Sequence, residues 1–184
     1  MRCCSAGVNV AASRNGVLAY RTGASGDEFA MTWFDRAGNF LSEIGLPGRF
    51  TNPALSPDEK WLAVGIREPK STTRDLWLFD LVRQTSTRLT FDAADELNPA
   101  WSPDGRHIAF SSDRKGQRDI YVVDASGTRE PVLVFQNANP KNLEQWTPDG
   151  KYLLVNTAPE KTPSDLYVVR AQGEAKRELG YRAA

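Results

Sequence analysis

The chain repeats itself with a period of about 45 residues, and this periodicity constrains its fold more than any other feature. Three segments align around a turn of the form Ser/Thr-Pro-Asp-Gly/Glu. The prolines of these turns stand 46 and 45 residues apart, at Pro57, Pro103 and Pro148. A fourth and weaker copy spans 13–20, where Arg14 replaces the proline. The chain is therefore expected to consist of tandem structural units rather than one irregular domain.

A second signature recurs downstream of each turn. It is a short run of apolar and aromatic residues closed by a charged residue, at 31–35, 76–80, 120–124 and 166–170. Two independent features share one period, which makes a chance similarity a poor explanation. The repeat is accordingly the strongest signal in the sequence.

Within one copy the apolar residues predict β-strands. They occur in short runs bounded by Gly, Pro, Asp and Ser, without an apolar stripe at helical spacing. In the third copy we expect strands at 98–102, 107–111, 119–124 and 131–135. Four short antiparallel strands in about 45 residues match one blade of a β-propeller.

The predicted fold class is therefore all-β, a β-propeller with four blades of four antiparallel strands. We expect a flexible N-terminus at 1–7 and a tail at 180–184. The four blades are expected at about 8–46, 47–92, 93–137 and 138–179.

The recurring turn has residues suited to a type I β-turn, since Ser accepts, Pro fixes φ and Gly tolerates a left-handed conformation. Glu59 stands where the other turns have glycine, so local strain of roughly 1 kcal/mol is expected there. Recurrence in every blade indicates a structural role for the turn and for the tryptophans of the first strand. These structural positions are Pro57, Asp58, Trp101, Pro103, Asp104, Trp146, Pro148 and Asp149.

The third copy resembles the WD40-like repeat of TolB-type β-propellers. The resemblance rests on 99–112 with its Pro-Ala-Trp-Ser-Pro-Asp-Gly core, on 113–116, and on Asp119-Ile120-Tyr121. Arg88-Leu89-Thr90, which closes the second copy, also matches. The resemblance covers about 8–179 and implies a propeller fold, while implying little about function.

A narrower resemblance concerns 13–21 and 33–38, which look like the propeller region that follows the kinase domain in some bacterial serine/threonine kinases. No glycine-rich loop with its lysine, His-Arg-Asp or Asp-Phe-Gly motif is present. TolB implies the periplasm, whereas the kinase resemblance implies a membrane-anchored architecture. A periplasmic or extracytoplasmic location and a cytoplasmic part of a bacterial protein both stay open.

The number of blades raises a question of closure, because TolB-type propellers commonly have six or more. An arc of four blades leaves an apolar face at each end. A small closed ring, an open arc completed by a partner or second copy, and a part of a larger propeller are the three alternatives. We prefer the last two, and self-association that completes the propeller is one expectation.

Composition narrows the classes of function. The chain has 23 basic and 23 acidic residues, so its formal net charge is zero. Nucleic-acid binding is not expected, because it requires an excess of positive charge. No apolar run approaches the roughly 18 residues that cross a bilayer, so this chain is not expected to insert into a membrane.

A catalytic role has little support. The Gly-x-Ser-x-Gly elbow is absent, and His107 is the single histidine. The alignment places His107 where other copies have Trp61 and Tyr152, which indicates a half-exposed strand residue rather than a general base. We expect no catalytic residues, no enzymatic activity and no cofactor.

One acidic cluster is a weak candidate for a divalent cation. Asp92, Asp95 and Glu96 occur once, in the loop between the second and third copies. The cluster lacks the spacing of a dedicated calcium loop, so a solvated acidic loop is the preferred interpretation and no metal is expected.

Binding has better support. Loops that follow the second strand of each blade are long and charged, at 67–74, 113–118 and 157–164. Loops held by a rigid scaffold commonly carry recognition. Their mixed signs favour a protein or peptide partner, although solvated hairpin ends are an equal alternative. The candidate binding residues are Arg67, Lys70, Arg74, Arg114, Lys115 and Arg118.

Two functional hypotheses follow. The first is a non-enzymatic propeller module for protein, peptide or ligand interaction, serving as the sensor or interaction part of a larger bacterial protein such as a kinase. The alternative is an accessory propeller that gates a prolyl-peptidase-like catalytic domain absent from this chain.

Overall fold

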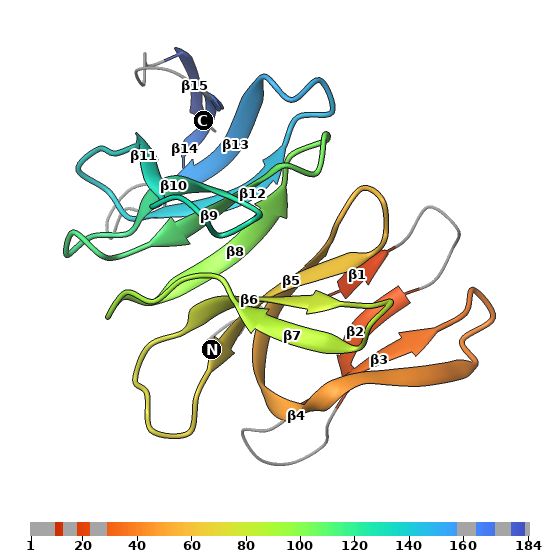
Figure 1. Ribbon diagram of the computed structural model, residues 1–184. Helices are drawn as coiled ribbons and strands as arrows, with labels where there is room; N and C mark the ends of the chain where they lie inside the picture. Colours follow the sequence, from red (N-terminus) through yellow and green to blue (C-terminus); the bar gives the residue numbers. More distant parts are fainter. Residues whose placement is uncertain (1–9, 13–17, 23–28, 158–164, 172–177, 183–184) are drawn as a thin grey trace, which may run out of the picture.

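The computed structural model describes residues 10–12, 18–22, 29–157, 165–171 and 178–182, and their regular secondary structure is β-strand throughout (Figure 1). The predicted flexible segment 1–7, the weak turn at 13–17 and most of the loop 157–164 lie outside the described residues. Within the described ranges, no helix has the length and apolar character to cross a membrane.

The strands succeed one another in each sheet in the order of the sequence, and each pairs antiparallel with the next. The described strands are β1 (Val10–Ala12), β2 (Leu18–Thr22), β3 (Phe29–Phe34), β4 (Phe40–Leu55), β5 (Trp61–Arg67), β6 (Asp75–Asp80), β7 (Thr85–Arg88), β8 (Glu96–Trp101), β9 (His107–Ser112), β10 (Asp119–Asp124), β11 (Val132–Phe135), β12 (Lys141–Trp146), β13 (Tyr152–Thr157), β14 (Asp165–Arg170) and β15 (Glu178–Arg182).

The long strand β4 belongs to two blades. Its first part, up to Gly48, pairs with β3, and its second part, from Arg49, pairs with β5. The seven-stranded sheet β1–β7 thus consists of blade 1 and blade 2 joined through β4, while β8–β11 form blade 3 and β12–β15 form blade 4. The predicted all-β propeller with four-stranded blades is confirmed.

The strand predictions for the third copy agree with blade 3. The third strand has the expected bounds, and the first begins two residues earlier than expected, at Glu96. At the end of the chain β15 reaches Arg182, so strand pairing extends into the predicted tail at 180–184.

The apolar core lies between successive blades. One buried cluster lies between blades 1 and 2, a second between blades 2 and 3, and a third between blades 3 and 4. Trp101 belongs to the second cluster with Leu76 of blade 2 and Ile108 of blade 3. Trp146 belongs to the third cluster with Ile120 and Leu153. Face-to-face burial of apolar side chains is therefore what joins these blades.

The recurring turn has the same hydrogen bonds in each described copy. In blade 3, Ser102 Oγ donates to Asp104 Oδ1 at 2.6 Å, and the His107 amide donates to Ser102 Oγ at 2.9 Å. These bonds, with the Ser102 hydroxyl first, lower the pKa of Asp104. Glu59 has a φ of 60°, close to the 70° of Gly105, which confirms that the turn of blade 2 keeps the strained conformation.

Candidate functional site

Two sets of loops meet on one face of the blades. The loop after the second strand of one blade contacts the loop that leads into the next blade. The Arg74 amide donates to Asp95 Oδ1 at 3.0 Å, and Gln117 Nε2 donates to the Asn137 carbonyl at 2.9 Å. This loop face is the surface on which the sequence places the candidate binding residues.

Three of the six candidate residues make ion pairs or hydrogen bonds within the molecule. Arg74 Nη1 lies 2.6 Å from Asp95 Oδ2, and Arg118 Nη1 donates to Asn142 Oδ1 at 2.9 Å. Arg114 pairs with both Asp92 and Glu96. These arginines therefore join blades and loops to one another, which is a structural use that the charge pattern of the loops does not reveal.

The other three candidates differ in position. Lys70 and Lys115 are exposed on the loop face. Arg67 is half-buried and lies at the end of β5, where it lines a groove between blade 1 and blade 2. The six residues therefore do not form a single site.

The three carboxylates of the acidic cluster form ion pairs with arginines of the chain. Asp95 pairs with Arg74, and Asp92 and Glu96 pair with Arg114. Among the residues that the structure describes, no three His, Cys, Asp or Glu side chains gather as metal ligands. The cluster contributes to the junction between blades 2 and 3 instead.

Glu96 is fully buried at the start of β8. Its carboxylate accepts hydrogen bonds from Thr90 Oγ1 and Arg114 Nη2, and the Arg114 guanidinium lies 4.6 Å from the centre of the Tyr121 ring. Burial is the largest effect on this carboxyl group and raises the pKa of Glu96 to about 7, against the opposing effects of Thr90 and Arg114. This glutamate can therefore change its charge near neutral pH.

Lys141 occupies the same position in blade 4, at the start of β12, and is also fully buried. Its Nζ donates to Asp119 Oδ1 at 2.7 Å, to the Asn137 carbonyl at 2.9 Å and to the Asn139 carbonyl at 2.5 Å. The repeat alignment puts Phe50, Glu96 and Lys141 in one column, so the available signal was a charged residue in two blades at the position where blade 2 has a phenylalanine. Lys141 was not among the candidate residues predicted from the sequence.

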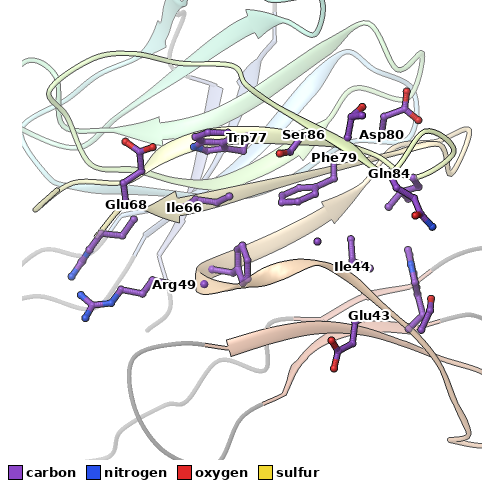
Figure 2. A pocket seen from close by; sticks show the side chains of 18 of the residues that line it. Glu43, Ile44, Arg49, Ile66, Glu68, Trp77, Phe79, Asp80, Gln84 and Ser86 are labelled. Atoms are coloured by element: carbon purple, nitrogen blue, oxygen red, sulfur yellow. The ribbon is translucent and has the colours of Figure 1, made fainter. Parts of the chain in front are cut away.

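A groove of about 770 Å³ separates blade 1 from blade 2 (Figure 2). Aromatic and aliphatic side chains make up much of its wall, including Trp33 and Ile44 of blade 1 and Trp77 and Phe79 of blade 2. The Phe50 and Phe79 rings meet edge to face with centroids 6.3 Å apart. This volume falls within the range of small-molecule and cofactor sites.

Glycines let β4 pass close to the aromatic side chains of the groove. A Cβ atom at Gly45, whose φ is 69°, would lie 2.6 Å from Phe79 Cε1. A Cβ atom at Gly48 would lie 2.9 Å from Phe50 Cζ. Both contacts are too short for a side chain, so the shape of the groove depends on these two glycines.

One end of the groove carries two arginines and two buried N–H donors. Arg49 and Arg67 are direct cross-strand partners on β4 and β5, and Figure 2 shows Arg49 at the same end as Glu68 and Trp77. Arg67 Nε and Trp77 Nε1 are buried and have no hydrogen-bond partner among the described residues. A buried donor without a partner costs about 1–3 kcal/mol, so a ligand with acceptor oxygens would be stabilised there.

Comparison with known proteins identifies the kind of domain. Residues 71–184 match the family described as the Tricorn protease N-terminal beta propeller domain. The chain is 30% identical over 146 residues to the "Uncharacterized peptidase YuxL" of Bacillus subtilis, which covers 71% of this chain and 22% of that protein. It is also 30% identical over 92 residues to the "Tol-Pal system protein TolB" of Desulfosudis oleivorans, covering 50% of this chain and 20% of that protein. The chain thus spans about a fifth of the length of these relatives.

Among solved structures, the putative TolB from Agrobacterium tumefaciens superposes with a TM-score of 0.74. The superposition covers 90% of this chain and 61% of that chain, at 20% sequence identity. It supports the propeller fold.

Proposed function

Because this chain belongs to the family of the Tricorn protease N-terminal β-propeller domain, we propose that it is a non-enzymatic propeller module that binds a peptide in the groove between blades 1 and 2. The observation that carries this proposal is the pair of buried donors, Arg67 Nε and Trp77 Nε1, in the groove wall. Both atoms are hydrogen-bond donors, so they favour a ligand that has acceptor oxygens.

The lining of the groove indicates the chemistry of the occupant. Trp33, Ile44 and Phe79 offer apolar contact along the groove, while the end that holds Arg49 and Arg67 has two positive charges against the single negative charge of Glu68. Guanidinium groups bind carboxylates with strong, charge-assisted hydrogen bonds. The matching ligand is a peptide with apolar side chains and a carboxylate at one end.

The rest of the molecule favours binding over catalysis. His107 is half-buried at the start of β9, on a strand rather than in the groove. The buried Glu96 carboxylate is held by Thr90 and Arg114. Thr90, Glu96 and Arg114 are thus used at the junction between blades 2 and 3, and recognition is the function that the groove supports best.

Calorimetric titration of the chain with an acetylated Ala-Leu-Ile-Leu peptide tests the proposal. The peptide with a free C-terminal carboxylate should bind about tenfold more tightly than its amide, because the amide loses a charge-assisted hydrogen bond. Arg67→Gln should abolish this preference. Lys115→Gln, at an exposed loop position, is the matched control and should keep it. Equal affinity of both peptides for the unmodified chain would contradict the proposal.

A second candidate function is an accessory propeller for a peptidase domain. It is favoured by the family match to a protease propeller and by the similarity to YuxL, a protein described as a peptidase. The full reading frame tests it: a Ser/His/Asp hydrolase domain continuous with the propeller supports this function. A kinase domain there would instead support the kinase-linked arrangement, and none of the proteins named above is described as a kinase.

A further inference from the structure

The third residue of the third strand is a large aromatic residue in blades 2, 3 and 4. These residues are Trp77, Tyr121 and Tyr167. Each ring packs against the buried cluster that its blade shares with the preceding blade. Tyr121 and Tyr167 are 2% and 8% exposed, whereas Trp77 is half-buried and lines the groove between blades 1 and 2. The same position is therefore closed at two junctions and open at the third.

At the two closed junctions, a planar group of the chain lies against the aromatic ring. The Arg114 guanidinium lies 4.6 Å from the centre of the Tyr121 ring. The centroids of the Phe135 and Tyr167 rings are 5.3 Å apart. Among the residues that the structure describes, none holds a cation or a second aromatic ring against Trp77. The groove thus presents to a ligand an aromatic surface that the chain itself covers at the other junctions.

Trp77 lies at the end of the groove where the ligand carboxylate is proposed to bind. Figure 2 shows Trp77 at the same end as Arg49 and Glu68. The other groove tryptophan, Trp33, is on blade 1 and pairs across the sheet with Ser42, in the first part of β4. The part of a ligand that reaches Trp77 is therefore the part next to its carboxylate.

The charge at this end favours a neutral aromatic ring over a cation as the group that covers Trp77. Arg49 and Arg67 contribute two positive charges, and Glu68 contributes one negative charge. A guanidinium from a ligand would meet an excess of positive charge there, whereas a neutral ring would not. The guanidinium of Arg114 is in a different environment, because two carboxylates pair with it.

We infer that the peptide bound in this groove ends in an aromatic residue, whose ring stacks on Trp77 while its terminal carboxylate binds Arg67. Arg67 Nε is the buried donor without a partner, so the carboxylate supplies the missing acceptor. One α-carbon carries both the carboxylate and the side chain, so a single C-terminal residue can make both contacts. Aromatic pairs add affinity beyond the burial of apolar area. The inference rests on the proposed function and adds the identity of the last residue of the ligand.

Calorimetric titration of the unmodified chain with four acetylated peptides tests the inference. All four have the sequence Ala-Leu-Ile followed by a last residue with a free carboxylate. The peptide that ends in phenylalanine should bind about fivefold more tightly than the one that ends in leucine. Cyclohexylalanine has the bulk of phenylalanine without its aromatic ring, so that peptide should bind more weakly than the phenylalanine peptide. The arginine peptide should also bind more weakly, because of the positive charge at this end of the groove.

Two tryptophan variants assign the preference to one side of the groove. Trp77→Leu should remove the preference for phenylalanine over leucine. Trp33→Leu is the matched control, because it removes the indole on the opposite wall of the groove. It should lower the affinity for both peptides alike and keep their ratio. Circular dichroism establishes that each variant is folded, and the comparison of peptides on the unmodified chain does not depend on either variant.

The outcomes separate this inference from the proposed function. Equal affinity for the phenylalanine and leucine peptides, tighter binding of the arginine or cyclohexylalanine peptide, or a preference that persists in Trp77→Leu would each overturn the inference. In these cases the proposed function stands if the carboxylate peptides still bind more tightly than their amides. Failure of all four peptides to bind would contradict the proposed function and the inference with it.

Discussion

The junction between blades 2 and 3 and the junction between blades 3 and 4 place opposite charges at the same position. Glu96 begins the inner strand of blade 3, and Lys141 begins that of blade 4. Each faces a blade whose third strand starts with an aspartate, Asp75 in blade 2 and Asp119 in blade 3. Lys141 therefore meets an opposite charge, whereas Glu96 meets a like charge.

The buried charges are neutralised in different ways at the two junctions. Asp119 pairs directly with Lys141, whose remaining donors reach two backbone carbonyls. Asp75 pairs instead with Arg88 at 2.8 Å, and Glu96 depends on Arg114 from a loop of its own blade. The charge of Asp75 also raises the pKa of Glu96, after the larger effect of burial. The same fold position thus tolerates either sign. Lys141 pairs directly with the aspartate that it faces, whereas Asp75 and Glu96 each pair with a separate arginine.

The largest expected difference between the junctions is in the free energy of unfolding when the cation of the Lys141–Asp119 or the Arg114–Glu96 ion pair is removed. Lys141→Met should lower the free energy of unfolding by about 3–5 kcal/mol, because it leaves the Asp119 carboxylate buried without its cation. Arg114→Met should cost about 1–3 kcal/mol, since Glu96 can take up a proton and avoid an unpaired charge. Urea denaturation at pH 7 measures both.

The double variant Lys141→Met with Asp119→Asn is the control for this comparison. It should recover part of the loss, because no unpaired charge is left at the junction. Equal costs for Lys141→Met and Arg114→Met would show that the two junctions do not differ in the way described.

Periodicity carries enough information to predict the blades and most strand positions, because every blade must place apolar residues on both faces of a thin sheet. The third strand of blade 3 follows directly from the run that ends at Asp124. The role of Arg114 could not be predicted in this way. A long loop side chain can point to solvent or into a junction, and only the placement of Glu96 and Asp92 decides between them. The groove is similarly beyond sequence patterns, since its width depends on how blade 1 packs against blade 2.

The stability of the fold should depend on pH through the buried carboxyl group of Glu96. The pKa of Glu96 is about 7 in the folded protein, above its ordinary value of 4.5. A carboxyl group with a raised pKa stabilises the fold fully below its ordinary pKa and loses that contribution as pH rises through the folded value. The free energy of unfolding should therefore fall by about 3 kcal/mol between pH 4.5 and pH 7 and level off above.

Chemical denaturation across this pH range measures the effect, and Glu96→Gln should flatten the profile. The turn carboxylates Asp58, Asp104 and Asp149 have lowered pKa values, each with a neighbouring hydroxyl as the first cause. Their contributions are lost at pH values below their ordinary range, so they do not obscure the window of Glu96. A profile that keeps its slope in Glu96→Gln would assign the effect to another group.

The smallest expected effect is a difference in stability between substitutions of the two tryptophans, Trp101 and Trp146, that lie at the two junctions. Trp101 Nε1 donates a 3.0 Å hydrogen bond to the Ala54 carbonyl on the inner strand of the preceding blade. Trp146 Nε1 is buried and has no hydrogen-bond partner among the described residues. Trp101→Phe and Trp146→Phe remove similar ring area, but only the first removes a hydrogen bond. Trp101→Phe should therefore be less stable than Trp146→Phe by about 1 kcal/mol in urea denaturation. Equal losses would mean that the indole of Trp101 stabilises its junction by packing alone.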